Sequence, residues 1–154
     1  MKVVIQRVSK ASVEIEGRLN GVIGAGLLIF VGIEEADGLQ DIDWLSRKIT
    51  QLRVMDDAEG IMNLSVSDTG GDIMIISQFT LHASTVKGNR PSYVRAARPE
   101  TAEPLYQAFC SKVSSDLGKP VVTGIFGAHM NITLINDGPV TIIIDSKCKE
   151  GINP

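Results

Sequence analysis

Polar residues at the exit of an apolar strand are the first candidates for chemistry in this sequence. Residues 73–76 are apolar and are predicted to form a buried strand, and Ser77-Gln78-Phe79-Thr80 follows directly. Gln78 can donate and accept hydrogen bonds, Thr80 offers a hydroxyl, and successive main-chain amides there could stabilise an oxyanion. The segment therefore predicts an oxyanion-stabilising site, although a strand exit with turn-forming polar residues is an equally good interpretation.

A second polar segment, Asn136-Asp137-Gly138-Pro139-Val140-Thr141, separates two apolar stretches near the end of the chain. Its composition is that of a hairpin turn. The Gly138–Pro139 bond is of the X-Pro type, which is cis in only about 5–6% of folded cases, so composition does not predict a cis bond. Taken alone, this segment predicts a turn and no chemistry.

No conventional catalytic arrangement can be recognised. The sequence has two histidines, His82 and His129, and it lacks a G-x-S-x-G elbow and an H-E-x-x-H pair. A metal site needs three or four ligands, so no metal and no cofactor are expected. His82 could act as a base for Thr80, although a lone histidine in a loop is more often solvated. Cys110 lies on a predicted helix and is expected to pack rather than to react.

The charge distribution suggests a small anionic target. The chain of 154 residues has a net charge of −3, which argues against a protein that coats long nucleic acids. Residues 73–99 contain no Asp or Glu and carry Lys87, Arg90, Arg95 and Arg98, a local charge of +4 that leaves −7 for the rest of the chain. A basic segment on an acidic body fits the end of a nucleic acid, and a solvated loop is the alternative.

Composition predicts one soluble, cytoplasmic domain. The chain is 44% hydrophobic and 21% charged, as in globular proteins that fold without a disulfide or structural metal. The longest apolar run, 26–33, is far shorter than a membrane helix, and the first residues do not resemble a secretory signal. The two cysteines, Cys110 and Cys148, do not form a C-x-x-C pair and are expected to be reduced thiols.

The order of predicted elements indicates an α/β fold with mixed sheets and helices packed on one side. Apolar residues at steps of three and four predict one helix with Asp37 as its N-cap and another from Pro99 to a stop at Gly118. The expected strands are 3–8, 11–15, 27–31, 73–76, 121–123, 130–135 and 140–144. Turns are expected at 9–10 and 17–21.

Together, Ser77-Gln78-Phe79-Thr80 and Asn136-Asp137-Gly138-Pro139-Val140-Thr141 resemble the two motifs of the D-aminoacyl-tRNA deacylases of the D-tyrosyl-tRNA deacylase type. The resemblance covers nearly the whole chain, with residues 1–150 as the deacylase domain and 151–154 as a C-terminal tail. It includes Gln6-Arg7-Val8, Gly88-Asn89-Arg90-Pro91-Ser92 and Phe126-Gly127-Ala128. Either motif alone is weak, but both in this order in a chain of this length are specific.

The resemblance implies a homodimer of a compact β/β/α fold with its active sites at the subunit interface. It implies that Gly138–Pro139 is cis and reaches into the partner's pocket. There its carbonyls would exclude L-aminoacyl esters and admit D-aminoacyl esters and, in part, glycyl esters. Arg7 is expected to brace this loop, a solvated arginine on a strand being the alternative. Met130 and Asn136 are expected to support the site.

The same resemblance implies that Ser77, Gln78, Phe79 and Thr80 line the opposite wall. Their main-chain amides would hold the ester carbonyl while the terminal ribose hydroxyl of the tRNA assists hydrolysis. Thr80 would then shape the pocket, and its action as a nucleophile is the alternative. Lys87 and Arg90 are candidate phosphate contacts. The implied partner is the acceptor end of an aminoacyl-tRNA, with no membrane involved.

Three other functions remain open. The chain could mainly clear glycine mischarged onto tRNA, since a glycyl ester would pass the same wall. It could be a non-catalytic module that binds the tRNA acceptor end, with Phe79 and the basic segment holding the terminal adenosine. It could also be a serine or threonine esterase for small esters, which would need a side-chain base that the sequence does not reveal.

Overall fold

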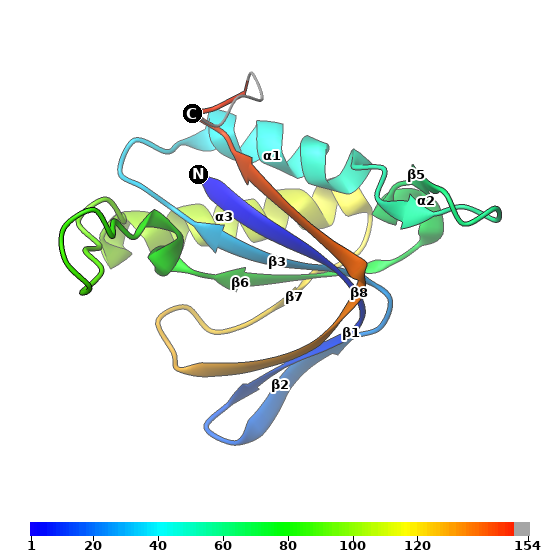
Figure 1. The fold of residues 1–154 in the computed structure, drawn as a ribbon, viewed down its shortest axis with the longest axis horizontal. Helices are drawn as coiled ribbons and strands as arrows, with labels where there is room; N and C mark the ends of the chain where they lie inside the picture. Colours follow the sequence, from blue (N-terminus) through cyan, green and yellow to red (C-terminus); the bar gives the residue numbers. More distant parts are fainter. Residues whose placement is uncertain (150–154) are drawn as a thin grey trace.

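Two long, bent strands organise the fold: β1 (Lys2–Ile15) and β8 (Met130–Asp145) pair antiparallel along their length (Figure 1). The computed structural model describes residues 1–149, so the tail predicted at 151–154 lies outside the described residues. The turn predicted at 9–10 and the hairpin turn that composition favours at 136–141 are both wrong. The register of the pair shifts at these places without ending, so the polar residues there mark bulges within continuous strands.

The remaining strands extend this pair into a sheet that curls toward closure. They are β2 (Arg18–Ile23), β3 (Gly26–Gly32), β6 (Asp72–Ser77) and β7 (Val122–Thr123), while β4 (Met55–Asp56) and β5 (Met62–Leu64) form a separate ribbon. The order is β2-β1-β3-β6-β7, with β3, β6 and β7 parallel and the other pairs antiparallel. The Asn20 side chain on β2 donates to the Thr123 carbonyl on β7 at 2.9 Å, so these two outer strands meet and the sheet is nearly a barrel.

Strand β2 begins where the sequence predicts a turn. The turn is confined to Glu16 and Gly17, whose φ angles are 52° and 74°, and Arg18 already pairs with Ile15. The first three residues of β2 are all exposed, so no alternation of apolar and polar residues reveals the strand in the sequence.

Two helices, α1 (Leu39–Gln51) and α3 (Pro99–Leu117), lie on one face of the sheet, and both were predicted (Figure 1). The short helix α2 (Val66–Thr69) and the 3-10 turn η1 (Phe79–His82) complete the elements of the described chain. Within residues 1–149, no helix combines the length and apolar character that crossing a membrane requires.

The ends of the two helices agree only in part with prediction. Gly118 ends α3 in the left-handed conformation, with a φ of 82°, as expected. Asp37 is not the N-cap of α1. Gly38 takes that place, and its amide donates to the Asp41 carboxylate at 3.0 Å. Asp37 is instead buried, one residue before the cap.

Two apolar cores lie on opposite faces of β3 and β6, because successive side chains of a strand point to opposite sides. One core includes Ile29 and Ile75 and packs against both helices. The other includes Leu28 and Met74 and packs against the second half of β1 with β2 and the first half of β8. The molecule therefore has helix, sheet and sheet layers, and the predicted α/β fold with mixed sheets is confirmed.

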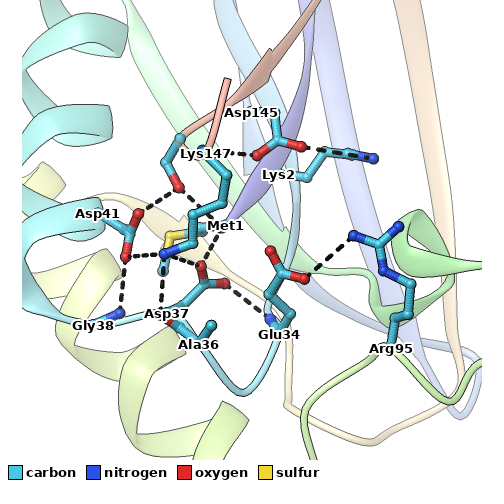
Figure 2. Close-up of polar contacts among 11 residues, drawn as sticks. Met1, Lys2, Glu34, Ala36, Asp37, Gly38, Asp41, Arg95, Asp145 and Lys147 are labelled. Atoms are coloured by element: carbon cyan, nitrogen blue, oxygen red, sulfur yellow. Dashed lines mark hydrogen bonds and ion pairs between the residues drawn. The ribbon is translucent and has the colours of Figure 1, made fainter. Parts of the chain in front are cut away.

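A buried charge network joins the start of β1, the end of β8 and the start of α1 (Figure 2). The α-ammonium group of Met1 forms an ion pair with Asp37 and donates to the Ser146 hydroxyl at 2.9 Å. That hydroxyl donates to Asp41 at 2.6 Å, and Lys147 Nζ lies 2.9 Å from Asp41 and 3.3 Å from Asp37. Two cations thus face two carboxylates, and the network holds the strand ends against the helix.

The carboxyl group of Asp41 makes this network sensitive to acid. Burial disfavours its charged form, but hydrogen bonds from Ser146, Lys147 and the Gly38 amide outweigh burial and lower its pKa from 3.8 to about 2. A carboxyl group with a lower pKa in the folded state stabilises the fold above its unfolded pKa. This stabilisation is lost as the pH falls from 3.8 through about 2.

We expect Asp41→Asn to lower the free energy of unfolding by about 2 kcal/mol at neutral pH, because the variant loses the charged partner of Lys147. The difference from the unmodified protein should shrink as the pH falls toward 2. Urea unfolding at pH 7 and pH 3 measures both effects. Asp43→Asn, at an exposed position on α1, is the control, and equal losses in the two variants would contradict the assignment.

Candidate active site

The predicted site segment leaves the sheet at the end of β6. The Gln78 amide donates to the Val31 carbonyl at 2.7 Å and extends the pairing of β3 with β6 by one residue, after which η1 begins. The amides of Phe79 and Thr80 donate to no other residue in 1–149, because the first amides of a helical turn have no partner within it. These two donors are therefore available to a bound oxyanion.

A cavity of about 590 Å³ opens beside this segment. Its lining residues are Val31, Ile33, Ile76, Ser77, Gln78, Phe79, Tyr93, Ala96, Ala97, Pro99, Ala102, Phe126, Gly127, Ala128, His129, Met130 and Ile132. Of the predicted site residues, Ser77, Gln78, Phe79 and Met130 line the cavity. Those that do not are Arg7, Thr80, Lys87, Arg90, Asn136, Gly138 and Pro139.

The cavity is apolar and, among the described residues, has no Lys, Arg, Asp or Glu in its lining. Phe79 and Tyr93 stand edge to face at its margin, with ring centroids 5.0 Å apart. An uncharged cavity with aromatic side chains at its margin suits a flat, uncharged group. Within residues 1–149, no three His, Cys, Asp or Glu side chains gather as a metal site would require.

Among residues 1–149, no histidine or carboxylate forms a hydrogen bond with the Thr80 hydroxyl. Its Oγ1 accepts a hydrogen bond from Gln78 Nε2 at 2.5 Å. The expectation that His82 is solvated is wrong, since it is only 3% exposed, and neither ring nitrogen has a hydrogen-bond partner in residues 1–149. Cys110 is buried as predicted, and burial raises the pKa of its thiol to about 11, which keeps it in the neutral, unreactive form.

The second predicted motif is a bulge in β8. Asn136 pairs with Val8 and Thr141 pairs with Gln6, so residues 137–140 stand opposite the single residue Arg7. The Gly138–Pro139 bond within this bulge is cis, and both residues are exposed. We call residues 137–140 the Gly-Pro bulge.

Arg7 and Asn136 fix the Gly-Pro bulge from inside. Arg7 is 6% exposed, so the alternative of a solvated head is wrong. Its Nε donates to the Asp137 carbonyl at 3.2 Å, and its Nη1 donates to the Val54 carbonyl and the Asp56 carboxylate, both at 2.9 Å. The side-chain amide of Asn136 donates through Nδ2 to the main-chain carbonyls of Arg7 at 3.0 Å and Val140 at 3.1 Å.

Gly138 has no room for a side chain in this arrangement. Its φ is +124°, which side chains rarely allow. An added Cβ would lie 2.9 Å from Val140 Cγ2, 3.0 Å from the Val140 amide nitrogen and 3.1 Å from Arg7 Nη2. The backbone at Gly138 is therefore presented bare on the surface.

Within one chain, the Gly-Pro bulge and the cavity are far apart. Arg7 pairs with Leu27, and Leu27 pairs with Ile73, which lies four residues before Ser77. At about 3.3 Å per residue along a strand, this separates them by roughly 13 Å in that direction alone. Figure 1 shows the bend of β8 and the arrowhead of β6 at opposite ends of the sheet.

The basic segment predicted to contact phosphate forms a closed loop near the cavity. Ser84 and Ser92 exchange two main-chain hydrogen bonds of 2.8 and 2.9 Å, and this pairing closes the loop that carries Lys87 and Arg90. Both cations are exposed. Tyr93, which lines the cavity, follows Ser92 directly, so the loop ends beside the cavity.

Tyr93 and His129 are lining residues that the sequence did not indicate as part of the site. Aromatic residues make up only 5% of the chain, and a tyrosine inside a polar, basic loop is a signal that could have identified Tyr93. His129 was noticed only as one of two histidines without metal spacing. No pattern in the sequence indicates that it lines the same cavity as Ser77.

Comparisons with known proteins agree with these features. The sequence model of a family described as D-Tyr-tRNA(Tyr) deacylase matches residues 4–145. The D-aminoacyl-tRNA deacylases of Parabacteroides distasonis and Bacteroides thetaiotaomicron are 61% and 60% identical to the chain, over 97% of it and 100% of each relative.

Two solved structures share the fold. The structure titled c-Myc DNA Unwinding Element Binding Protein has a TM-score of 0.87 and 37% identity, covering 94% of this chain and 98% of that one. A probable eukaryotic D-amino acid tRNA deacylase has a TM-score of 0.80 and covers 93% of this chain and 97% of its own, and at 16% identity it supports the fold alone.

These matches define the class of the protein: it is an enzyme, and its reaction is hydrolysis. More narrowly, the chain belongs to the D-Tyr-tRNA(Tyr) deacylase family. The membership that the two motifs predicted is therefore confirmed.

We expect Arg7→Ala to lower the free energy of unfolding by about 2–4 kcal/mol, because the buried Val54 carbonyl and the partly buried Asp137 carbonyl lose their donor. Arg18→Ala is the matched control, since Arg18 is exposed on β2 and forms no ion pair with a described residue. Its effect should stay within about 0.5 kcal/mol. Denaturant unfolding compares the two, and similar losses would show that the Arg7 contacts contribute little.

Proposed function

We propose that this enzyme hydrolyses the ester bond of D-aminoacyl-tRNA, releasing the free D-amino acid and the tRNA. The observation that carries the proposal is the Gly-Pro bulge, which is exposed, held from inside by Arg7, and distant from the cavity of its own chain. A bare, fixed backbone of this kind can exclude a substrate side chain by steric collision. The relatives at about 60% identity, which are named D-aminoacyl-tRNA deacylases, support the same substrate.

In this proposal, the bulge of one subunit enters the cavity of a second copy, so that a homodimer holds two active sites at its interface. Strand β8 pairs only with β1 among the described strands, which leaves its other edge for a partner. Ile135 and Ile143 are 58% and 61% exposed along this strand, an arrangement that favours burial against another protein surface.

Chirality would be selected by exclusion rather than by attraction. With Gly138–Pro139 against the α-carbon of the substrate, an L side chain collides with main-chain carbonyls while a D side chain points into open space. Glycine has no side chain, so glycyl-tRNA passes the same wall, and clearance of mischarged glycine follows as a second activity.

Hydrolysis would depend on main-chain donors and on the substrate itself. The unpaired amides of Phe79 and Thr80 support stabilisation of the oxyanion, with Ser77 and Gln78 completing that wall. Within residues 1–149, the Thr80 hydroxyl pairs with Gln78 and with no histidine or carboxylate, which favours assistance from the terminal ribose hydroxyl. Thr80 then shapes the segment through its hydrogen bond with Gln78 rather than acting as a nucleophile.

The remaining predicted residues have supporting parts in this proposal. Met130 lines the cavity, and Asn136 holds the bulge through two hydrogen bonds. Lys87 and Arg90 extend from the cavity margin, where the phosphates next to the terminal adenosine would lie. The proposed setting is the cytoplasm, where aminoacyl-tRNA is present.

A non-catalytic module that binds the tRNA acceptor end is the alternative. The uncharged cavity with Phe79 and Tyr93 at its margin, beside a basic loop, would serve such a module equally well. Binding and turnover are therefore measured separately.

We expect the purified protein to hydrolyse D-tyrosyl-tRNA rapidly and to leave L-tyrosyl-tRNA intact, with and without a chelator. The amount of ester that remains is followed over time for both enantiomers. Binding of the charged tRNA without cleavage would establish the module instead. Cleavage of both enantiomers would contradict the proposal that Gly138–Pro139 excludes L-aminoacyl esters.

We expect Gly138→Ala to lower the ratio of D to L hydrolysis by about tenfold or more, equivalent to about 1.4 kcal/mol, because the added Cβ displaces the bulge. Gly24→Ala is the matched control, since a Cβ at Gly24 would meet no atom within 4 Å. The kcat/KM values for both enantiomers and the affinity for tRNA are measured. A loss of affinity with an unchanged ratio would favour the binding module.

A further inference from the structure

A basic groove on the second half of α1 lies outside the cavity and is not used by the proposed reaction. Its volume is about 500 Å³. The lining residues are Trp44, Arg47, Lys48, Gln51, Leu52 and Arg53. Three of these six carry a positive charge and none is acidic, and we call this feature the Trp44 groove.

The cations of the Trp44 groove are only partly balanced by carboxylates, because Arg47 lies near Asp116 and Arg53 near Asp68 without forming an ion pair. Lys48 Nζ and Lys149 Nζ lie 5.6 and 5.5 Å from the centroid of the Trp44 ring, so a fourth cation joins the groove. Within residues 1–149, none of Arg47, Lys48, Arg53 and Lys149 lies within ion-pair distance of a carboxylate. By contrast, the cations that do form ion pairs elsewhere include Lys2, Lys112, Lys119 and Lys147.

This cluster is unusual for an acidic chain. The four cations contribute +4 to a protein with a net charge of −3. With the +4 of residues 73–99, they leave −11 on the rest of the chain. Eight of the 15 Lys and Arg residues therefore lie in these two places. A concave, basic surface beside an aromatic ring fits a polyanion with regularly spaced phosphates.

The Trp44 groove adjoins the residues that hold the Gly-Pro bulge. Arg53 lines the groove, and the next residue, Val54, accepts a hydrogen bond from Arg7 at 2.9 Å. Arg7 in turn holds the Asp137 carbonyl of the bulge. A tRNA whose aminoacylated end contacts the Gly-Pro bulge would therefore pass close to the Trp44 groove.

We infer that the Trp44 groove binds the phosphate backbone of a tRNA. The aminoacylated end of the same tRNA would be selected by the adjoining Gly-Pro bulge. This inference rests on the proposed function and adds a second RNA contact to it. The basic loop with Lys87 and Arg90 serves the cavity margin, and the groove serves the body of the tRNA. Arg47 and Lys48 provide the charge, while Arg53 also donates to the Asn63 carbonyl at 2.8 Å and so has a structural part.

The test compares Arg47→Ala/Lys48→Ala with Lys10→Ala/Arg18→Ala. The control pair also removes one arginine and one lysine from exposed positions, on β1 and β2. Each protein is assayed on D-tyrosyl-tRNA and on D-tyrosyl-adenosine, which keeps the ester and the terminal nucleoside but lacks the tRNA body. The dependence of tRNA binding on salt concentration is measured in parallel.

The groove variant should lose about tenfold in kcat/KM on D-tyrosyl-tRNA and keep its activity on D-tyrosyl-adenosine. The slope of log affinity against log salt should fall by about 1 to 2, as expected for one or two lost phosphate contacts. The control should change neither value. Equal behaviour of the two variants, or an equal loss on both substrates, would overturn the inference.

Failure of the proposed function gives a different result. If the unmodified protein cleaves neither substrate, the deacylase proposal fails, while binding of uncharged tRNA still tests the groove. Weaker tRNA binding by the groove variant alone would then support the groove without catalysis. Unchanged binding, or capture of an acidic protein at the groove in place of tRNA, would overturn it.

Discussion

The antiparallel pairing of β1 with β8 is the constraint on which the rest of the structure depends. It spans both apolar cores, so each strand contributes to two layers and neither core forms without it. Its interruption opposite Arg7 lets residues 137–140 bulge from β8 while the pairing continues on both sides. The position of the Gly-Pro bulge is thus set by strand register.

The two sequence motifs lie toward opposite ends of the sheet within one chain. The cavity lies at the end of β6, and the bulge lies toward the opposite end of the same sheet. The buried network around Asp41 and Met1 secures the strand ends on the cavity side of β1, and Arg7 secures the bulge on the other side. A site that needs both motifs is therefore better served by two chains than by one.

Much of the fold could be predicted because burial leaves a pattern in the sequence. The helices were expected where they occur because apolar residues recur at steps of three and four, and strands β3 and β6 because their apolar runs are continuous. The continuity of β1 and β8 was not expected, because polar residues occur in bulges and in turns alike. Burial of His82 and the position of Tyr93 depend on tertiary contacts, which local patterns do not record. The residues of the two motifs were enough to predict the family. The distance between the two motifs in the folded chain is known only from the structure.

The Gly-Pro bulge also limits how sequences of this kind can evolve. Side chains along β8 alternate between faces, and Leu134 before the bulge and Ile142 after it each pack against a core. Loss or gain of one residue between them would turn half of the strand inside out. Insertions and deletions in the bulge would therefore remove a core, so its length is constrained by packing in addition to the constraint that the lack of room at Gly138 places on its composition.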